Sequence, residues 1–255
     1  MTVAACAALV ERGDPDRFVA VMAAPAHVRA QLLPLYAFNL EVARAPWVTE
    51  EPLIAEMRLQ WWRDVVENTA SGAARAHEVA GPLHDLIRDF GLPVEVLDRL
   101  IAARRWDIHR EAHDGPEALE AYLEDTGAGL MWLAARALGA PDTAEMPIRA
   151  FGWASAAAGY LAAIPKLMAL GRQPLPDGVT AKGLAEMGLE RLKIARAARK
   201  SVPRGITPAL LAGWQTKGLL RQAKVNPDRV AAGQLQLSEF ARRGGLIRAA
   251  FIGVI

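Results

Sequence analysis

The chain has 255 residues, of which 52% are hydrophobic and 23% are charged, and its net charge is +2. This composition excludes an intrinsically disordered chain and supports a sizeable buried core. The single cysteine, Cys6, excludes a framework of internal disulfides and a zinc site built from several cysteines.

Helical periodicity dominates the chain, since apolar residues recur at spacings of three and four and Pro/Gly pairs separate the runs. The pattern predicts helices over 3–12, 15–23, 26–45, 51–70, 79–90, 94–112, 117–139, 144–170, 181–200 and 208–225, then a shorter C-terminal pair. No Gly/Ser linker divides the chain, so we expect one all-α domain over residues 1–255. The window at 201–208 is the one candidate boundary.

From the sequence we expect neither a leader nor a membrane span. Its start lacks a basic region followed by an apolar run, and its longest uncharged stretch, 150–165, has sixteen residues. A helical span of a bilayer needs about 20 residues. We therefore expect a cytoplasmic protein.

Charge is distributed unevenly along the chain. Residues 191–255 contain 13 Lys or Arg and only two acids, Asp228 and Glu239, so this third carries +11 and the first 190 residues carry −9. The asymmetry, together with an apolar tail over 244–255, predicts contact with a membrane surface at the inner face or with a protein partner. Nucleic acid is disfavoured because few aromatic residues accompany the basic run. The alternative is that these bases pair with acids of the first part within one domain.

No general catalytic motif is present, neither a phosphate-binding Gly-rich loop nor G-x-S-x-G nor H-E-x-x-H. His109 and His113 are spaced as on one face of a helix, with Asp107 and Asp114 nearby. That spacing can bind a metal ion. A solvated, charged helix face is the favoured interpretation, and we predict no metal site.

The stretch around Trp61 and Trp62 combines aromatic and polar residues on one predicted helix. Spacings of four place Glu56, Gln60 and Asp64 on one face, with Arg58 and Arg63 close by. A polar stripe on a core-facing helix indicates a lined cavity, whereas the same stripe on a surface helix forms ordinary ion pairs. Both interpretations remain open from the sequence.

Four segments, in this order, resemble the squalene/phytoene synthase family of isoprenoid synthases. They are LYAFNLEVAR (Leu35 to Arg44), EMRLQWWRDVV (Glu56 to Val66), the stretch from Arg104 to Gly139 and the stretch from Phe151 to Pro176. The resemblance covers residues 14–200 and implies a single helical bundle of the isoprenoid-synthase type around a deep apolar cavity. Catalytic members of the family join two prenyl diphosphates head to head, with Mg²⁺ held by two aspartate motifs.

The first aspartate motif is altered in this chain. Tyr36 and Phe38 match the family pattern, while Asn39 and Leu40 replace its Cys-Arg pair. The three aspartate positions hold Ala43, Arg44 and Trp47. A shift of the alignment by one helical turn would offer Glu41 as a substitute carboxylate.

The second aspartate motif is also altered. The family's Gly-Arg and Leu-Pro marks are present at 171–172 and 175–176, but the polar and acidic positions before them hold Ala156, Gly159, Ala162, Ala163, Lys166 and Leu167. Mg²⁺ requires oxygen ligands. The comparison therefore implies no resident cofactor, with Mg²⁺ expected only if the chain is catalytic after all.

The variant motifs resemble a degenerate branch that includes the mitochondrial assembly factor of respiratory complex I. We therefore expect a non-catalytic protein that binds lipid or protein, with assembly of a respiratory complex as one role. The alternatives are a Mg²⁺-dependent head-to-head prenyltransferase and a prenyl-lipid carrier. A prenyl or other lipid is the expected ligand of the central cavity. The candidate cavity residues are Tyr36, Phe38, Asn39, Glu41, Arg44, Arg58, Gln60, Trp61, Arg63, Asp64, Asp107 and Tyr122.

Overall fold

The protein is described by a computed structural model that covers residues 2–70, 72–109 and 111–254. In these ranges every regular element is helical, as the sequence predicted. The longer helices are α1 (Val3–Gly13), α2 (Pro15–Ala23), α3 (Ala26–Arg44), α4 (Pro52–Glu67), α5 (Ala80–Phe90), α6 (Val94–Ala103), α7 (Gly115–Leu123), α8 (Gly129–Ala137), α9 (Glu145–Ala169), α10 (Ala181–Ala197), α12 (Thr216–Val225) and α14 (Glu239–Ile252). Two single-turn helices, α11 (Thr207–Leu210) and α13 (Asp228–Ala231), complete the C-terminal part.

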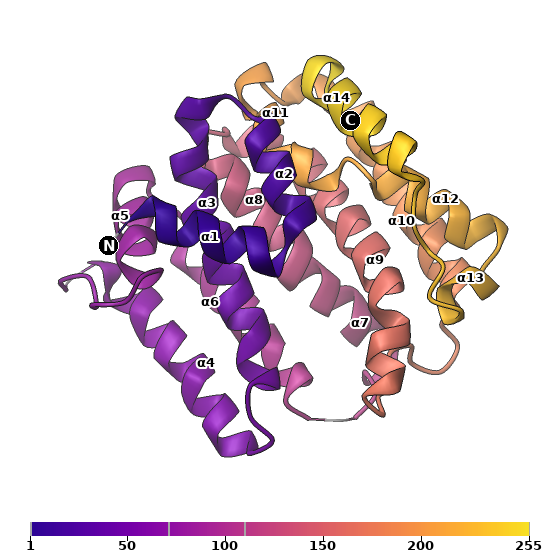
Figure 1. The fold of residues 1–255 in the computed structure, drawn as a ribbon, viewed down its shortest axis with the longest axis horizontal. Coiled ribbons are helices and arrows are strands. Elements are labelled where there is room, and N and C mark those ends of the chain that lie inside the picture. Colours follow the sequence, from indigo (N-terminus) through magenta and orange to yellow (C-terminus); the bar gives the residue numbers. More distant parts are fainter. Residues whose placement is uncertain (1, 71, 110, 255) are drawn as a thin grey trace.

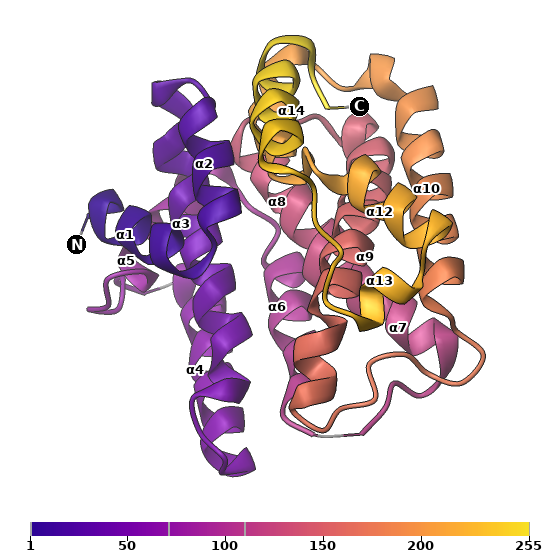
Figure 2. The same ribbon diagram turned by 45° about the vertical axis from the view of Figure 1, so that its right-hand side comes forward.

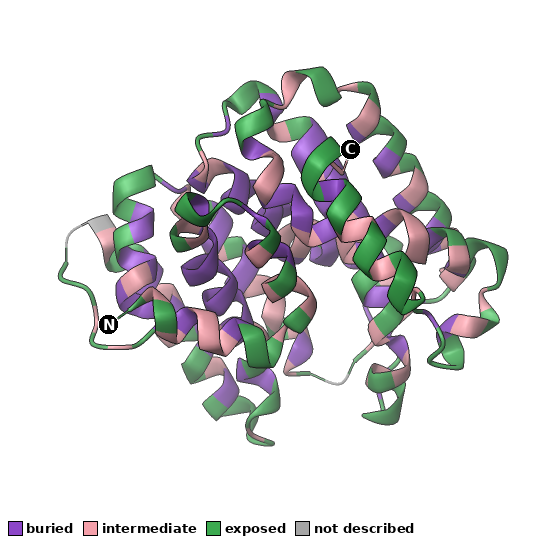
Figure 3. Cartoon of the chain, turned by 45° about the horizontal axis from the view of Figure 1, so that its top comes forward, coloured by how far each residue is buried: buried purple, intermediate pink, exposed green. Residues whose placement is uncertain are grey.

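The helices form three layers, which Figure 1 and Figure 2 show from two directions. The first layer holds α1 to α4, the middle layer holds α6, α8 and α9, and the last holds α10, α12 and α13. Helix α9 contacts α8 and the segment after α7 on one side and α10 on the other. The C-terminal helix α14 returns to contact α2. Buried residues line the inner faces of the layers (Figure 3).

Local sequence signals explain several helix boundaries. Asp14 caps α2 by accepting a hydrogen bond from the Arg17 backbone N–H, and Pro15 occupies the first turn. Pro34 does not end α3, which continues through it to Arg44. Within the described residues no helix is both long enough and apolar enough to cross a bilayer.

A π-helical turn, Glu124–Ala128, joins α7 to α8 and lies against α9. This contact is built from small residues. A Cβ atom added to Gly127 would lie 2.2 Å from Cβ of Ala156, and one added to Gly152 would lie 2.8 Å from Cα of Ala128. The two helices therefore approach closely only because glycine occupies these positions.

The predicted helix over 94–112 is wrong in its second half. Helix α6 ends at Ala103 and is followed by a 3₁₀ turn, Arg104–Asp107, and an irregular segment. Arg110 lies outside the described residues. The predicted helix over 208–225 is likewise divided, with a 3₁₀ turn (Leu211–Gly213) between α11 and α12. The first break shapes the candidate site.

Candidate functional site

A cavity of about 590 Å³ lies inside the bundle. Its lining comes mainly from α3, from the two turns Ala45–Trp47 and Arg104–Asp107, from the segment spanning α7, the π-helical turn and α8, and from α9. Helix α2 and the turn Leu211–Gly213 contribute one residue each. Most of the lining side chains are apolar or small. Trp62 and Trp153 are buried in the surrounding core and do not line the cavity. These two tryptophans therefore do not fill it.

The end of α3 and the part of α9 from its middle onward contribute the cavity walls where the resemblance places the family's aspartate motifs. The wall residues in question are Ala43 and Trp47 near the end of α3, and Ala156, Gly159, Ala163, Lys166 and Leu167 on α9. None of them carries a carboxylate. Among the lining residues that the structure describes, Asp107 is the only acid.

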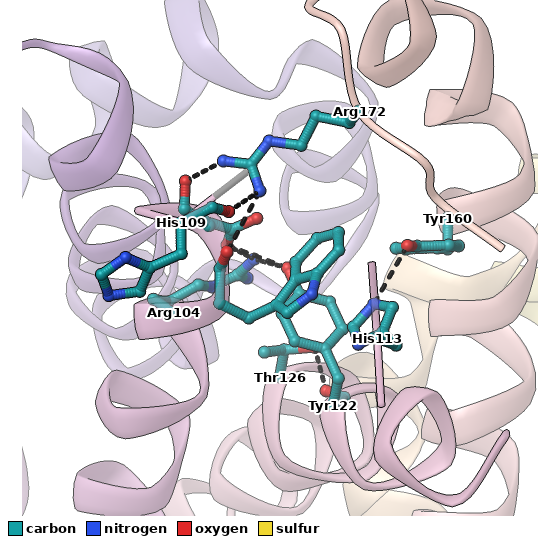
Figure 4. A network of polar contacts seen from close by, with 9 residues as sticks. Arg104, His109, His113, Tyr122, Thr126, Tyr160 and Arg172 are labelled. Atoms are coloured by element: carbon teal, nitrogen blue, oxygen red, sulfur yellow. Dashed lines mark hydrogen bonds and ion pairs between the residues drawn. The ribbon is translucent and has the colours of Figure 1, made fainter. Parts of the chain in front are cut away.

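The polar end of the cavity is formed by Arg104 and Asp107 from the 3₁₀ turn and by Tyr122 from α7 (Figure 4). Arg104 Nη1 donates to the Tyr122 hydroxyl at 2.7 Å, and this hydroxyl donates to Asp107 Oδ2 at 3.0 Å. Arg104 Nη1 also lies 3.4 Å from the same carboxylate oxygen. Both side chains therefore direct a donor at one buried carboxylate.

Burial changes the protonation behaviour of this end of the cavity. It raises the pKa of Asp107, against the opposing effects of the Arg104 charge and the Tyr122 hydrogen bond. Burial also raises the pKa of Tyr122 and raises that of Tyr36 to about 12. The two phenols are therefore neutral hydrogen-bond donors at neutral pH.

Arg172 binds the backbone of the irregular segment that follows α6. Its guanidinium donates to the carbonyl oxygens of Trp106, at 3.1 Å, and of Asp107 and His109 (Figure 4). It also lies over the rings of Trp47, at 4.9 Å, and Trp106, at 5.1 Å. These carbonyls bind the guanidinium, and the described backbone between Asp107 and Gly115 is irregular, so Arg172 fixes the course of the segment that follows α6.

His113 is a buried part of the same assembly. Its ring stacks on Trp106 with centroids 3.8 Å apart, and its Nε2 lies 3.1 Å from the Tyr160 hydroxyl. That hydroxyl donates its proton to the Pro174 carbonyl at 2.6 Å, so His113 Nε2 must be the donor in their contact. Burial, and then the charge of Arg172, lower the pKa of His113 to about 4. The ring is therefore neutral at physiological pH.

His109 and His113 do not lie on a helix, so their spacing of four does not place them on one face. His109 is exposed, whereas His113 is buried. In the described ranges no three His, Cys, Asp or Glu side chains converge closely enough to hold a metal ion. The prediction of a solvated helix face at this position is wrong, because the segment is irregular and half of it is buried.

Three residues that line the cavity each have one polar side-chain atom that is buried without a hydrogen-bond partner among the described residues. They are Asn39 Oδ1, Arg104 Nε and Trp106 Nε1. A buried polar atom that forms no hydrogen bond costs about 1–3 kcal/mol. The polar atoms without partners concentrate at the end of the cavity that Arg104 and Asp107 form.

Four of the residues predicted to line the cavity do so: Tyr36, Asn39, Asp107 and Tyr122. Phe38 belongs to the core, where its ring contacts Trp62 edge to face at 5.4 Å. The remaining predicted residues lie elsewhere: Glu41, Arg44, Arg58, Gln60, Trp61, Arg63 and Asp64.

The prediction that the polar stripe of α4 lines the cavity is wrong. Arg63 pairs with Asp98 of α6, with Nη2 to Oδ2 at 3.1 Å, and both side chains are partly exposed. Gln60 donates to Asp64 at 2.8 Å on the exposed side of the helix. The surface-helix interpretation is the correct one here.

Glu41, Arg58 and Trp61 share a separate, shallow pocket of about 210 Å³ with Trp62 and His77. Arg44 is exposed at the end of α3. Glu41 is therefore not a lining residue of the cavity, and the shifted alignment that would use it as a substitute carboxylate finds no support.

Sequence reasoning missed several residues that shape the site. These are Arg17, Arg104, Trp106, Thr126, Tyr160 and Arg172. Arg172 could have been found from the sequence, because it belongs to the Gly-Arg pair that matches the family motif. The Gly171 that precedes it has φ of 75°, a left-handed conformation that glycine favours and that ends the turn after α9. Nothing in the local pattern indicated which carbonyls the arginine would bind.

A sequence model of the squalene/phytoene synthase family matches residues 10–238. The chain is 28% identical over 137 residues to NADH dehydrogenase (ubiquinone) complex I, assembly factor 6, of Bos taurus, which covers 54% of this chain and 41% of the bovine protein. It is 31% identical over 209 residues to the Drosophila melanogaster homolog, which covers 79% of this chain and 60% of the fly protein. The chain thus spans less than two thirds of these curated relatives.

Solved structures share the fold. A dehydrosqualene synthase in complex with ligand superposes with a TM-score of 0.81 at 13% identity, covering 96% of this chain and 93% of the other. Squalene synthase HpnC from Alicyclobacillus acidocaldarius superposes with a TM-score of 0.72 at 20% identity, covering 88% and 93%. At these identities the likeness concerns the fold, and it agrees with the predicted all-α bundle of the isoprenoid-synthase type.

Proposed function

Because the chain belongs to the squalene/phytoene synthase family, we propose that it is a non-catalytic member that binds a lipid in its cavity. The observation that carries this proposal is the chemistry of the two walls described above. At the polar and acidic positions of the family's two aspartate motifs, the cavity presents alanine, tryptophan, glycine, lysine and leucine. Mg²⁺ is held by carboxylate and other oxygen ligands, so these residues do not fit the ion.

The charges around the cavity support an anionic or hydrogen-bonding head group on the ligand. Arg17, Arg104 and Lys166 all line it, against the single carboxylate of Asp107. Asp107 is already engaged by Arg104 and Tyr122. A cation would meet repulsion here, whereas a phosphate or carboxylate would be attracted. The apolar remainder of the lining suits a prenyl or other hydrocarbon chain.

The relatives support a role in the assembly of a membrane-bound respiratory complex, since the bovine and fly proteins are named as assembly factors of complex I. For this chain we infer a working location in the cytoplasm, at the inner face of a membrane. A Mg²⁺-dependent prenyltransferase is the alternative function, and it requires carboxylates that the described cavity lining lacks.

The deciding experiment incubates the protein with farnesyl or geranylgeranyl diphosphate, with and without Mg²⁺, and measures released diphosphate together with ligand binding. We expect no diphosphate release and no Mg²⁺ site tighter than about millimolar by calorimetry. We also expect saturable binding, observed as a change in tryptophan fluorescence, because Trp47 and Trp106 line the cavity. Diphosphate release would overturn the proposal in favour of the prenyltransferase.

A pair of variants tests whether the cavity is the binding site. Ala163→Phe places a ring in the cavity and should abolish binding, because Ala163 lines it. Ala162→Phe, one residue away on the exposed side of α9, should bind as the unmodified protein does. Equal binding by both variants would exclude the cavity as the ligand site.

A further inference from the structure

Four cationic side chains, from the packed helices α10 and α12 and from α14, are near enough for their charges to interact. They are Arg196 on α10, Lys217 and Arg221 on α12, and Arg248 on α14, and together they are called the cationic cluster below. Within the described residues no carboxylate forms an ion pair with any of the four. The cluster therefore differs from Lys193 and Lys224 on the same two helices, which pair with Glu190 and Glu186.

The four charges are close enough to affect one another. Burial, and then the charges of Arg221 and Arg248, lower the pKa of Arg196. The charges of Arg196 and Arg221 are the main causes that lower the pKa of Lys217. Like charges held together in this way oppose folding, and an anion bound among them would relieve the repulsion.

Helix α14 is attached to the body along one side only. Trp214 Nε1 donates to the Arg242 carbonyl at 3.3 Å, the Arg242 side chain pairs with Asp16 of α2, and Ala249 is buried. These contacts fix the orientation of the helix, so its opposite side faces away from the bundle (Figure 3).

The outward side of α14 is apolar. Phe240, Ile247 and Phe251 are separated by seven and four residues, a spacing that places them on one stripe of a helix. Phe240 is 90% exposed and Phe251 is 87% exposed. Ile252 is also exposed beside the stripe. Ile255, which the sequence pattern assigned to the same tail, lies outside the described residues.

Arg248 joins the two features, since it belongs to the cationic cluster and immediately follows Ile247 of the stripe. The one acid of the helix, Glu239, is bound by Arg242 and Arg243. An apolar stripe beside unneutralised cations is the pattern of helices that lie in the interface of an anionic membrane. A second copy of this chain would place cationic cluster near cationic cluster, and charge complementarity therefore favours a negatively charged occupant.

We propose that α14 and the cationic cluster form a docking surface for an anionic phospholipid bilayer. Phe240, Ile247 and Phe251 enter the interfacial region, and lipid phosphates are bound by Arg196, Lys217, Arg221 and Arg248. This inference rests on the membrane location proposed above and gives it a specific surface. It is independent of ligand binding in the cavity.

The test is co-sedimentation of the full chain with vesicles of phosphatidylcholine alone and of phosphatidylcholine mixed with phosphatidylglycerol, at low and high salt. We expect binding to the mixed vesicles only, and its loss at high salt. Arg221→Gln with Arg248→Gln should weaken binding on the order of 30-fold, from about a fivefold contribution of each cation. Phe240→Ser with Phe251→Ser should also weaken it.

Matched controls distinguish binding through this surface from nonspecific electrostatic or hydrophobic binding. Lys193→Gln with Lys224→Gln removes two paired cations from the same helices, and Leu53→Ser with Met57→Ser removes two exposed apolar residues of α4. Both should bind mixed vesicles as the unmodified protein does, and circular dichroism should show all variants folded. Equal binding to the two vesicle types, no binding to either, or an equal loss in the controls would overturn the proposal.

Two further readouts separate the remaining explanations. A dimer in analytical ultracentrifugation that disappears in Phe240→Ser with Phe251→Ser would overturn the proposal in favour of a second copy of the chain as the occupant. The cavity variant Ala163→Phe should still bind mixed vesicles. Failure of docking with intact ligand binding would therefore leave the cavity proposal standing, and the reverse result would leave the docking surface standing.

Discussion

The polar end of the cavity and the polar face of α4 use the same residue types with different consequences. Asp107 is 4% exposed and is bound by Arg104 and Tyr122. The side chain of Arg63 on α4 is 26% exposed and forms its ion pair near solvent. Exposed ion pairs contribute about 0–1 kcal/mol, whereas breaking a buried pair costs about 3–5 kcal/mol. Burial therefore decides which of two similar Arg/Asp groups holds the structure together.

The largest effect should come from Arg172→Met. The substitution leaves the carbonyl oxygens of Trp106, Asp107 and His109 without their donor. We expect a loss of about 3–5 kcal/mol in the free energy of unfolding, measured by urea denaturation. Arg105→Met is the control, because Arg105 pairs with Glu56 at an exposed position. A loss below about 1 kcal/mol would show that the segment keeps its shape without the arginine.

Asp107→Ala should have the next largest effect. It removes the carboxylate that accepts from Arg104 and Tyr122 and leaves the arginine buried without its counter-charge. We expect a loss of about 3 kcal/mol in the free energy of unfolding. Asp107→Asn keeps an acceptor oxygen and should lose about half as much. If both variants are as stable as the unmodified protein, the polar end of the cavity is dispensable for folding.

His113 should make stability depend on pH. Its pKa is lowered to about 4 in the folded protein, whereas an unperturbed histidine titrates near 6.5. Between these two pH values the unfolded chain binds a proton at His113 that the folded chain does not bind. The free energy of unfolding is therefore at its full value above pH 6.5 and falls as the pH drops toward 4. We expect a loss of about 2 kcal/mol, discounted for partial solvent access.

Urea denaturation across this pH range measures the His113 effect. His113→Asn should remove this part of the pH dependence, while His27→Asn, at an exposed position of α3, should leave it intact. An unchanged slope in His113→Asn would assign the dependence to another group.

The smallest effect should come from Arg63→Ala. Had Arg63 been buried with its partner, its removal would have cost about 3–5 kcal/mol. Since the pair with Asp98 is partly exposed, we expect about 0.5–1 kcal/mol. Thermal unfolding of this variant beside Asp107→Ala compares the two regions directly. A loss as large as that of Asp107→Ala would refute the distinction between them.

The sequence by itself determined the helical class, most helix positions and the family. Periodicity and local capping signals such as Asp14-Pro15 act within a few residues, so they can be read along the chain. Tyr36, Asn39, Asp107 and Tyr122 were found through the resemblance, because family motifs keep their register in the fold.

Only the tertiary structure decided the conformation of 104–113 and whether the polar stripe of α4 faces solvent or the cavity. Arg172 binds carbonyls more than sixty residues earlier in the chain and so holds the segment after α6 in an irregular conformation, where the local pattern predicts a continuing helix. Spacing shows that Gln60 and Asp64 share a face of α4, but whether that face meets solvent or a cavity depends on which helices pack around it. Local patterns define faces, and the environment of a face is set by contacts between segments that are distant in sequence.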